Sequence, residues 1–145
     1  MTRIGDSAFY KCTELSSVTI PDGLCVIRER TFKDCTRLGS IDLPASVIQI
    51  EGYAFQNSGL TSLTIPGEAF WGIYDGAFQG CASLGSITLS AREPVFEEFY
   101  LGVDIFDGTP AGFKVYVPTH LVEDYKNNEY WAVYADRIEA IPSEP

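Results

Sequence analysis

The sequence is poor in positive charge and in histidine. Lys and Arg number 10 against 20 Asp and Glu, which gives a formal net charge of −10, and there is 1 His. An acidic surface repels both the phosphate backbone of nucleic acids and anionic membrane faces. The single histidine, His120, has no nucleophile motif beside it, which argues against a hydrolase triad or a metal site. The sequence therefore indicates neither a nucleic-acid-binding protein nor an enzyme.

Long apolar runs and export signals are also missing. No apolar run approaches the roughly 18 residues that a membrane helix needs. Met1-Thr2-Arg3 leads directly into patterned sequence, and we interpret this start as a cut inside a longer protein, so that the missing signal does not indicate the cytoplasm. The 4 cysteines lack the C-x-x-C spacing of zinc sites. Small buried thiols explain three of them better than a disulfide between Cys12 and Cys35.

What the sequence does contain is a repeat with a period of 23 residues. Three columns carry it most clearly: Ile4, Ile27, Ile50 and Ile73; Phe9, Phe32, Phe55 and Phe78; and Cys12, Cys35, Ser58 and Cys81. We place four repeats in residues 1–90, at about 4–26, 27–49, 50–72 and 73–90. A single unit of this size cannot bury its apolar residues alone, so we expect the units to stack and each column to form an interior ladder.

Each unit combines two local patterns. Ser-Val-Thr-Ile-Pro at 17–21 alternates polar and apolar residues, and 40–44, 62–66 and 86–90 repeat the alternation, which predicts a half-buried strand. The A-F-x-x-C stretch is too short for a full helix and predicts a single tight helical turn. The segment around Val47 and Ile50 predicts a second short extended piece. Stacked units would then pair these strands in parallel.

The period breaks after Ser90. Phe106 lies 28 residues after Phe78, so residues 91–118 form a degenerate fifth repeat with an insertion. We predict that residues 113–117 form the last strand and that Thr119 is the N-cap of a helix. Residues 119–145 are then a C-terminal helical cap that covers the last repeat.

The unit I-x-x-x-A-F-x-x-C-x-x-L-x-x-V-x-I-P resembles the BspA-type (Treponema-type) leucine-rich repeat. Residues 4–21 and 27–44 match it closely, whereas 50–66 and 73–90 depart slightly. The ending Val-Tyr-Val-Pro at 115–118, followed by aromatic residues, is similar to the usual end of this family. The resemblance implies a leucine-rich-repeat solenoid of a secreted or cell-surface bacterial protein. It implies adhesion and binding of a host or extracellular-matrix protein, and it supplies no catalytic residues and no cofactor.

Two surfaces are candidates for binding. The first is exposed aromatic and apolar material, provided that Cys25, Ile48 and Trp71 point outward while their neighbours point inward. Its predicted members are Tyr10, Ile48, Tyr53, Trp71, Tyr74, Phe96, Phe99 and Tyr100. The aromatic residues of the insertion are alternatively part of the core. The second candidate is the polar strand face, with Thr19, Asp42, Thr64 and Thr88, although small polar residues also suit an ordinary strand surface.

The sequence thus favours a non-catalytic module for protein–protein interaction or adhesion. An accessory spacer or carbohydrate-binding arm of a larger secreted protein remains the alternative. Neither reading requires a cofactor, a metal, nucleic acid or membrane insertion of this fragment.

Overall fold

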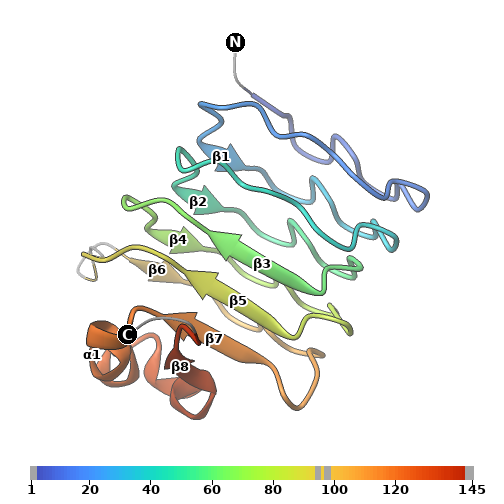
Figure 1. Cartoon of the computed structure of the whole chain (residues 1–145). Helices are drawn as coiled ribbons and strands as arrows, with labels where there is room; N and C mark the ends of the chain where they lie inside the picture. Colours follow the sequence, from blue (N-terminus) through green and yellow to red (C-terminus); the bar gives the residue numbers. More distant parts are fainter. Residues whose placement is uncertain (1–2, 94–95, 97–98, 143–145) are drawn as a thin grey trace.

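The computed structural model describes residues 3–93, 96 and 99–142, and its elements follow one another as short strands that give way to short helices near the C-terminus (Figure 1). The strands are β1 (Val26–Ile27), β2 (Gln49–Ile50), β3 (Ser62–Ile65), β4 (Gly72–Ile73), β5 (Ser86–Leu89), β6 (Tyr100–Leu101), β7 (Lys114–Val117) and β8 (Ile138–Ala140). The helical segments are η2 (Thr119–Leu121), α1 (Val122–Asn127) and η3 (Ala132–Arg137).

These strands form two parallel sheets. One sheet has the order β1-β2-β4-β6 and the other β3-β5-β7-β8. In the first sheet Ile27 pairs with Ile50, and Ile50 pairs with Ile73, so residues of one sequence column lie side by side. The predicted parallel strands are therefore confirmed, and so is the second short extended piece, which is β2.

The phenylalanine column forms a continuous interior row. The ring centroids of Phe9 and Phe32 lie 5.4 Å apart, those of Phe32 and Phe55 5.3 Å, and those of Phe55 and Phe78 5.5 Å. The three inner rings are 0% exposed. Phe106 extends the row, with its ring 5.9 Å from that of Phe78, even though the insertion separates the two in sequence. The predicted ladder is confirmed.

The A-F-x-x-C stretches are runs of turns, and the predicted single helical turn is wrong. The Phe32 amide donates to the Ala54 carbonyl of the next unit, whereas the Lys33 amide donates back to the Arg30 carbonyl. Positive φ recurs in two columns, at Ser7, Arg30, Tyr53 and Gly76 and at Lys11, Asp34, Asn57 and Gly80. Alternate amides thus bond to the neighbouring unit, which the i→i−4 pattern of an α-helix does not permit.

The polar–apolar alternation predicts strands better in the later units than in the first two. Residues 62–65 and 86–89 are β3 and β5, whereas 17–20 and 40–43 are extended without being strands. Ile41 and Leu43 are nevertheless buried while Asp42 is exposed. Side-chain alternation therefore persists where strand pairing is absent. The two extended segments line a cleft of about 230 Å³, which is consistent with their looser association.

The C-terminal segment differs from prediction in two details. Residues 114–117 form β7, so the strand predicted at 113–117 is confirmed, but it is not the last one, because β8 follows it and pairs with it through Val115 and Ile138. Thr119 is also not an N-cap, because it lies inside η2, whose cap residue is Pro118. In the part of the chain that the structure describes, no helix has the length and apolar character needed to cross a bilayer.

Aromatic packing joins this C-terminal segment to the strands. Trp131 is 0% exposed, and its ring lies 5.6 Å from that of Phe99 and 5.5 Å from that of Tyr125. Burial raises the pKa of the Tyr125 phenol, since the charged form would be poorly solvated there. Tyr125 of α1 and Trp131, which directly precedes η3, therefore pack against the aromatic core.

Candidate partner-binding surface

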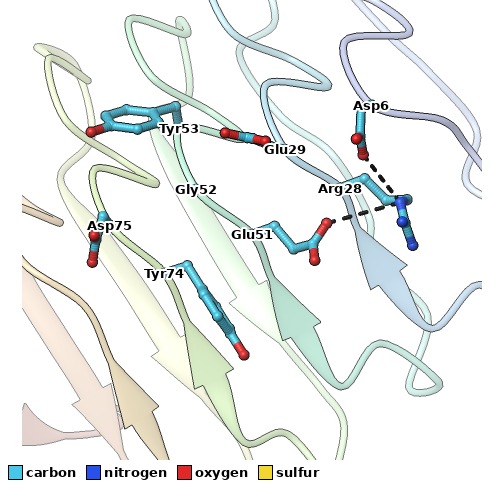
Figure 2. A pocket seen from close by; sticks show the side chains of 8 residues that line it. All are labelled: Asp6, Arg28, Glu29, Glu51, Gly52, Tyr53, Tyr74 and Asp75. Carbon is cyan, nitrogen blue, oxygen red and sulfur yellow. Dashed lines mark hydrogen bonds and ion pairs between the residues drawn. The ribbon is translucent and has the colours of Figure 1, made fainter.

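A cleft of about 340 Å³ opens beside the sheet β1-β2-β4-β6 (Figure 2). Three lining residues directly follow its strands: Arg28 follows β1, Glu51 follows β2 and Tyr74 follows β4. Because the strands are parallel, these residues meet at one edge of the sheet. The complete lining is Asp6, Arg28, Glu29, Glu51, Gly52, Tyr53, Tyr74 and Asp75.

Arg28 ties three successive units together at the cleft. Its Nε lies 3.1 Å from Oδ1 of Asp6 and 3.9 Å from Oε1 of Glu51 (Figure 2). The side chains of Arg28 and Asp6 are 31% and 58% exposed, so each pair contributes at most about 1 kcal/mol to folding. The arrangement matters more for geometry, because it holds a guanidinium between two carboxylates at the cleft wall.

The tyrosines of the cleft pack against a glycine or against another aromatic ring. Gly76 has a φ of +62°, and a Cβ there would collide with the ring of Tyr53. The ring of Tyr74 packs against that of Tyr100, with centroids 4.7 Å apart. Because Gly76 has no Cβ, the ring of Tyr53 can pack directly against the backbone of the following unit.

Asp75 is fixed from two sides. Its Oδ1 accepts the Val103 amide at 2.9 Å and the Tyr100 hydroxyl at 3.4 Å. The negative charge of Asp75 raises the pKa of the Tyr100 phenol, because it disfavours a second negative charge nearby. A Cβ at Gly102 would collide with the Asp75 carboxylate, so this side chain also depends on a glycine in the next unit.

Cations of the chain itself lie over the neighbouring tyrosine rings. Arg30 is 5.6 Å and Lys33 6.0 Å from the ring centroid of Tyr53. Lys11 is 5.2 Å and Lys33 5.7 Å from that of Tyr10. These distances fall within the range of cation–π attraction. The surface next to the cleft is thus a strip of alternating tyrosine and positive charge.

Several residues of the predicted aromatic surface meet here. Tyr53 and Tyr74 line the cleft, and Tyr100, which is 41% exposed, packs on Tyr74. Tyr10 is 39% exposed and lies on the adjoining strip of tyrosine and cations.

The column of Cys25, Ile48 and Trp71 points as expected. Cys25 is exposed, while Ile48 and Trp71 are half-buried. The neighbours expected to point inward are buried: Leu24, Val47 and Phe70. Backbone hydrogen bonds join the column, since Trp71 N–H donates to the Ile48 carbonyl at 2.9 Å. This column therefore supplies partly exposed apolar surface.

Of the aromatic residues predicted in the insertion, Tyr100 is exposed beside the cleft, whereas Phe96 and Phe99 pack inward. Phe99 is 4% exposed and packs against Phe70 and Trp131, so its assignment to a binding surface is wrong. Phe96 is half-buried, with its ring 4.9 Å from that of Tyr125 in an edge-on contact. Both rings fold inward because the C-terminal segment offers them an apolar partner. Residues 94, 95, 97 and 98 of the insertion lie outside the described residues.

The alternative strand face is divided between two environments. Thr64 pairs with Thr88 across β3 and β5, and Thr64 is exposed while Thr88 is half-buried. Thr19 and Asp42 are exposed and line the cleft of about 230 Å³ that borders the first two units. This face is therefore accessible, and Tyr116 of β7, which pairs with Thr88, continues it with a half-buried aromatic ring.

The cysteine column belongs to the core. The Cys35 thiol donates to the Phe9 carbonyl at 3.1 Å and the Cys81 thiol to the Phe55 carbonyl at 3.0 Å. Burial raises the pKa of Cys35 to about 11 and also raises that of Cys81. All four cysteines are free thiols, and Cys12 is half-buried. A raised pKa disfavours the reactive thiolate, so the column acts structurally.

Sequence reasoning missed the charged half of the cleft. Asp6, Glu29 and Asp75 occupy one column of the 23-residue repeat, with Gly52 as its gap. Arg28 and Glu51 occupy the preceding column. Both charged columns keep the 23-residue spacing, and this spacing is the sequence signal that marks these residues.

The chain matches a known family of repeats. A profile of the BspA-type leucine-rich repeat region matches residues 2–108 as 6 copies. A leucine-rich repeat protein from Bacteroides ovatus has a crystal structure that is similar over 78% of this chain and 42% of that chain. Its sequence identity is 23% and the TM-score is 0.48. This chain thus spans less than half the length of that protein. No protein of curated function matches the sequence.

The profile match extends over most of the chain and ends in the unit that contains Phe106. With residues 2–108 of 145 matched, the chain belongs to the BspA-type leucine-rich repeat family.

Proposed function

We propose that the chain is a non-catalytic protein-interaction module that acts in adhesion at the bacterial cell surface. The observation that carries this proposal is the cleft of about 340 Å³, around which Tyr53 and Tyr74 gather on a stack of paired strands. Tyrosine at a partly exposed, well-supported position is typical of binding hot spots. The family supports protein binding as well, because repeats of this kind offer long continuous surfaces.

The architecture that presents this surface is an open solenoid with a 23-residue period. Residues 1–90 form four repeats, 91–118 a fifth with an insertion, and 119–145 the C-terminal cap. Buried Leu121, Tyr125 and Trp131 support the cap assignment, because they cover the last unit with apolar surface. A cap of this kind blocks aggregation at the open end of a repeat array.

The proposed partner is a host or extracellular-matrix protein. The acidic net charge of −10 supports a protein over a nucleic acid. A secreted or surface location follows from the adhesive role. A spacer or carbohydrate-binding arm of a larger secreted protein is the alternative, and a glycan array distinguishes its carbohydrate form.

The test is saturable binding of the purified chain to immobilised extracellular-matrix proteins, measured by surface plasmon resonance. Trp71→Ala combined with Tyr74→Ala should weaken binding at least about tenfold, which is the effect of losing 1.4 kcal/mol. Thr64→Ala combined with Thr88→Ala is the matched control, because it alters the other sheet. Equal binding by the aromatic variant, or stronger loss in the threonine variant, would overturn the assignment to this surface.

A further inference from the structure

We propose that the cleft between Tyr53 and Tyr74 binds an arginine or lysine side chain of the protein partner. This inference rests on the proposed protein-binding function and names the chemistry that the cleft selects. Its occupant is a basic peptide segment, held by carboxylates and by the faces of tyrosine rings.

The charges lining the cleft favour a cation. Four carboxylates line it, from Asp6, Glu29, Glu51 and Asp75, against the one guanidinium of Arg28. Arg28 lies between Asp6 and Glu51, and Nη1 of Arg30 lies 3.3 Å from Oε1 of Glu29. Four carboxylates against these two arginines still leave the cleft negative, and Asp75 is the lining carboxylate that neither arginine contacts. The Glu51 side chain is 27% exposed and that of Glu29 46%. These oxygens are therefore reachable, yet less fully hydrated than on an open surface.

Two observations independent of the carboxylates point to the same occupant. First, the chain's own cations already lie over the rings on this side, with Arg30 at 5.6 Å from Tyr53 and Lys11 at 5.2 Å from Tyr10. Second, the cleft is a concavity of about 340 Å³, which lies within the size range of ligand sites. A guanidinium entering it would meet an aromatic face and carboxylates together.

Arg28 provides an internal example of this recognition. Its guanidinium contacts carboxylates from the units on either side, at 3.1 Å from Asp6 and 3.9 Å from Glu51. One unit further along, Tyr74 occupies the position that follows the strand, and Asp75 supplies the next carboxylate (Figure 2). The chain thus binds the Arg28 guanidinium itself, and open space of the cleft remains beside Tyr74 and Asp75.

Other occupants fit the cleft less well. An anionic ligand would be repelled by the carboxylates. Among the residues that the structure describes, no three His, Cys, Asp or Glu side chains converge closely enough to hold a metal ion. An uncharged peptide would use the tyrosine faces but leave the excess negative charge of the cleft uncompensated.

The experiment measures fluorescence anisotropy of a labelled peptide that alternates glycine and arginine. Its control probe carries citrulline, the uncharged isostere, in place of arginine. The whole chain is compared with Glu29→Gln/Glu51→Gln/Asp75→Asn, which removes three charges from the cleft. The matched variant Glu123→Gln/Glu129→Gln/Asp136→Asn removes three exposed charges from the C-terminal segment.

We expect the cleft variant to bind the arginine peptide at least about tenfold more weakly, and the matched variant to stay within about twofold of the unaltered chain. Circular dichroism melting confirms that each variant is folded, and Tyr74→Leu tests the aromatic wall alone. Equal loss in both triple variants would reduce the effect to net charge and overturn the proposal. Binding of the citrulline peptide with the same affinity, or of neither peptide, would also overturn it.

Failure here leaves the broader function open to its own test. If the chain binds a matrix protein but not the arginine peptide, the cleft does not select cations and the interaction module stands. If it binds the arginine peptide but no matrix protein, the cleft chemistry stands and the adhesive role fails.

Discussion

Truncating a phenylalanine ring should destabilise the fold by an amount that depends on where the ring lies in the row. Phe55→Ala removes a fully buried ring with a neighbour on each side, at 5.3 and 5.5 Å. Phe9→Ala removes the same group from the same local sequence pattern. However, Phe9 is half-buried and has one ring neighbour, at 5.4 Å.

The magnitudes follow from burial and from the number of ring contacts. Truncating a buried Phe costs about 3–5 kcal/mol, and each aromatic pair adds roughly 0.5–1.5 kcal/mol beyond area burial. Phe55→Ala should therefore lower the free energy of unfolding by about 4–5 kcal/mol. Phe9→Ala should lower it by about 1–2 kcal/mol, because it removes roughly half as much buried surface and half as many ring contacts as Phe55→Ala. Phe55→Leu keeps apolar bulk and should lower it by about 1–3 kcal/mol.

Urea unfolding followed by circular dichroism measures these differences. The slopes of the free energy against urea must agree among the variants, since a stack of repeats can unfold in parts. The reasoning is refuted if Phe9→Ala and Phe55→Ala are equally destabilising. It is also refuted if Phe55→Leu is neutral, because ring stacking would then contribute nothing.

Three further predictions concern positions outside the phenylalanine row. Gly76→Ala should lower the free energy of unfolding by about 1–3 kcal/mol, because φ is positive there and the Tyr53 ring lies in the way, whereas Gly85→Ala should have a much smaller effect; differential scanning calorimetry compares the two. The pKa of the Cys35 thiol is raised from 9.0 to about 11, so the contribution of this thiol to stability is complete below pH 9 and is lost as the pH rises toward 11. The melting temperature of Cys35→Ala should fall less over that window than that of the unaltered chain, and an identical fall would contradict the raised pKa. Trp131→Ala should cost about 3–5 kcal/mol, measured by thermal melting, and a loss below about 1 kcal/mol would show that the C-terminal segment does not stabilise the strands.

The stacking of the units could be predicted from sequence because the same residues recur in register. Ile27, Ile50 and Ile73 form a column in the sequence and pair with one another in the sheet. Predicting that a column stacks requires no knowledge of the backbone angles, since each residue only has to face the equivalent residue of the next unit. Burial in a row follows directly from a constant period.

The local conformation and the irregular end could not be predicted in the same way. The turns at Ser7 and Lys11 have positive φ, which neither residue favours, so the hydrogen bonds of the next unit impose it. Phe99 is buried by Trp131, a residue outside the repeat and therefore outside its pattern. Ile138 forms a strand because β7 offers an edge, and its own short sequence carries no such signal.

The dependence of Tyr53 on Gly76, and of Asp75 on Gly102, limits how this gene can change. The interior columns would allow any unit to be copied next to any other, since their contents are nearly the same. Two outer side chains restrict this, because the residue that Tyr53 or Asp75 packs against in the next unit must lack a Cβ. A second copy of the unit of Tyr53, placed directly after the first, would put the Cβ of a tyrosine against the Tyr53 ring, so the units that contain Tyr53, Gly76 and Gly102 are expected to be inherited together, in a fixed order.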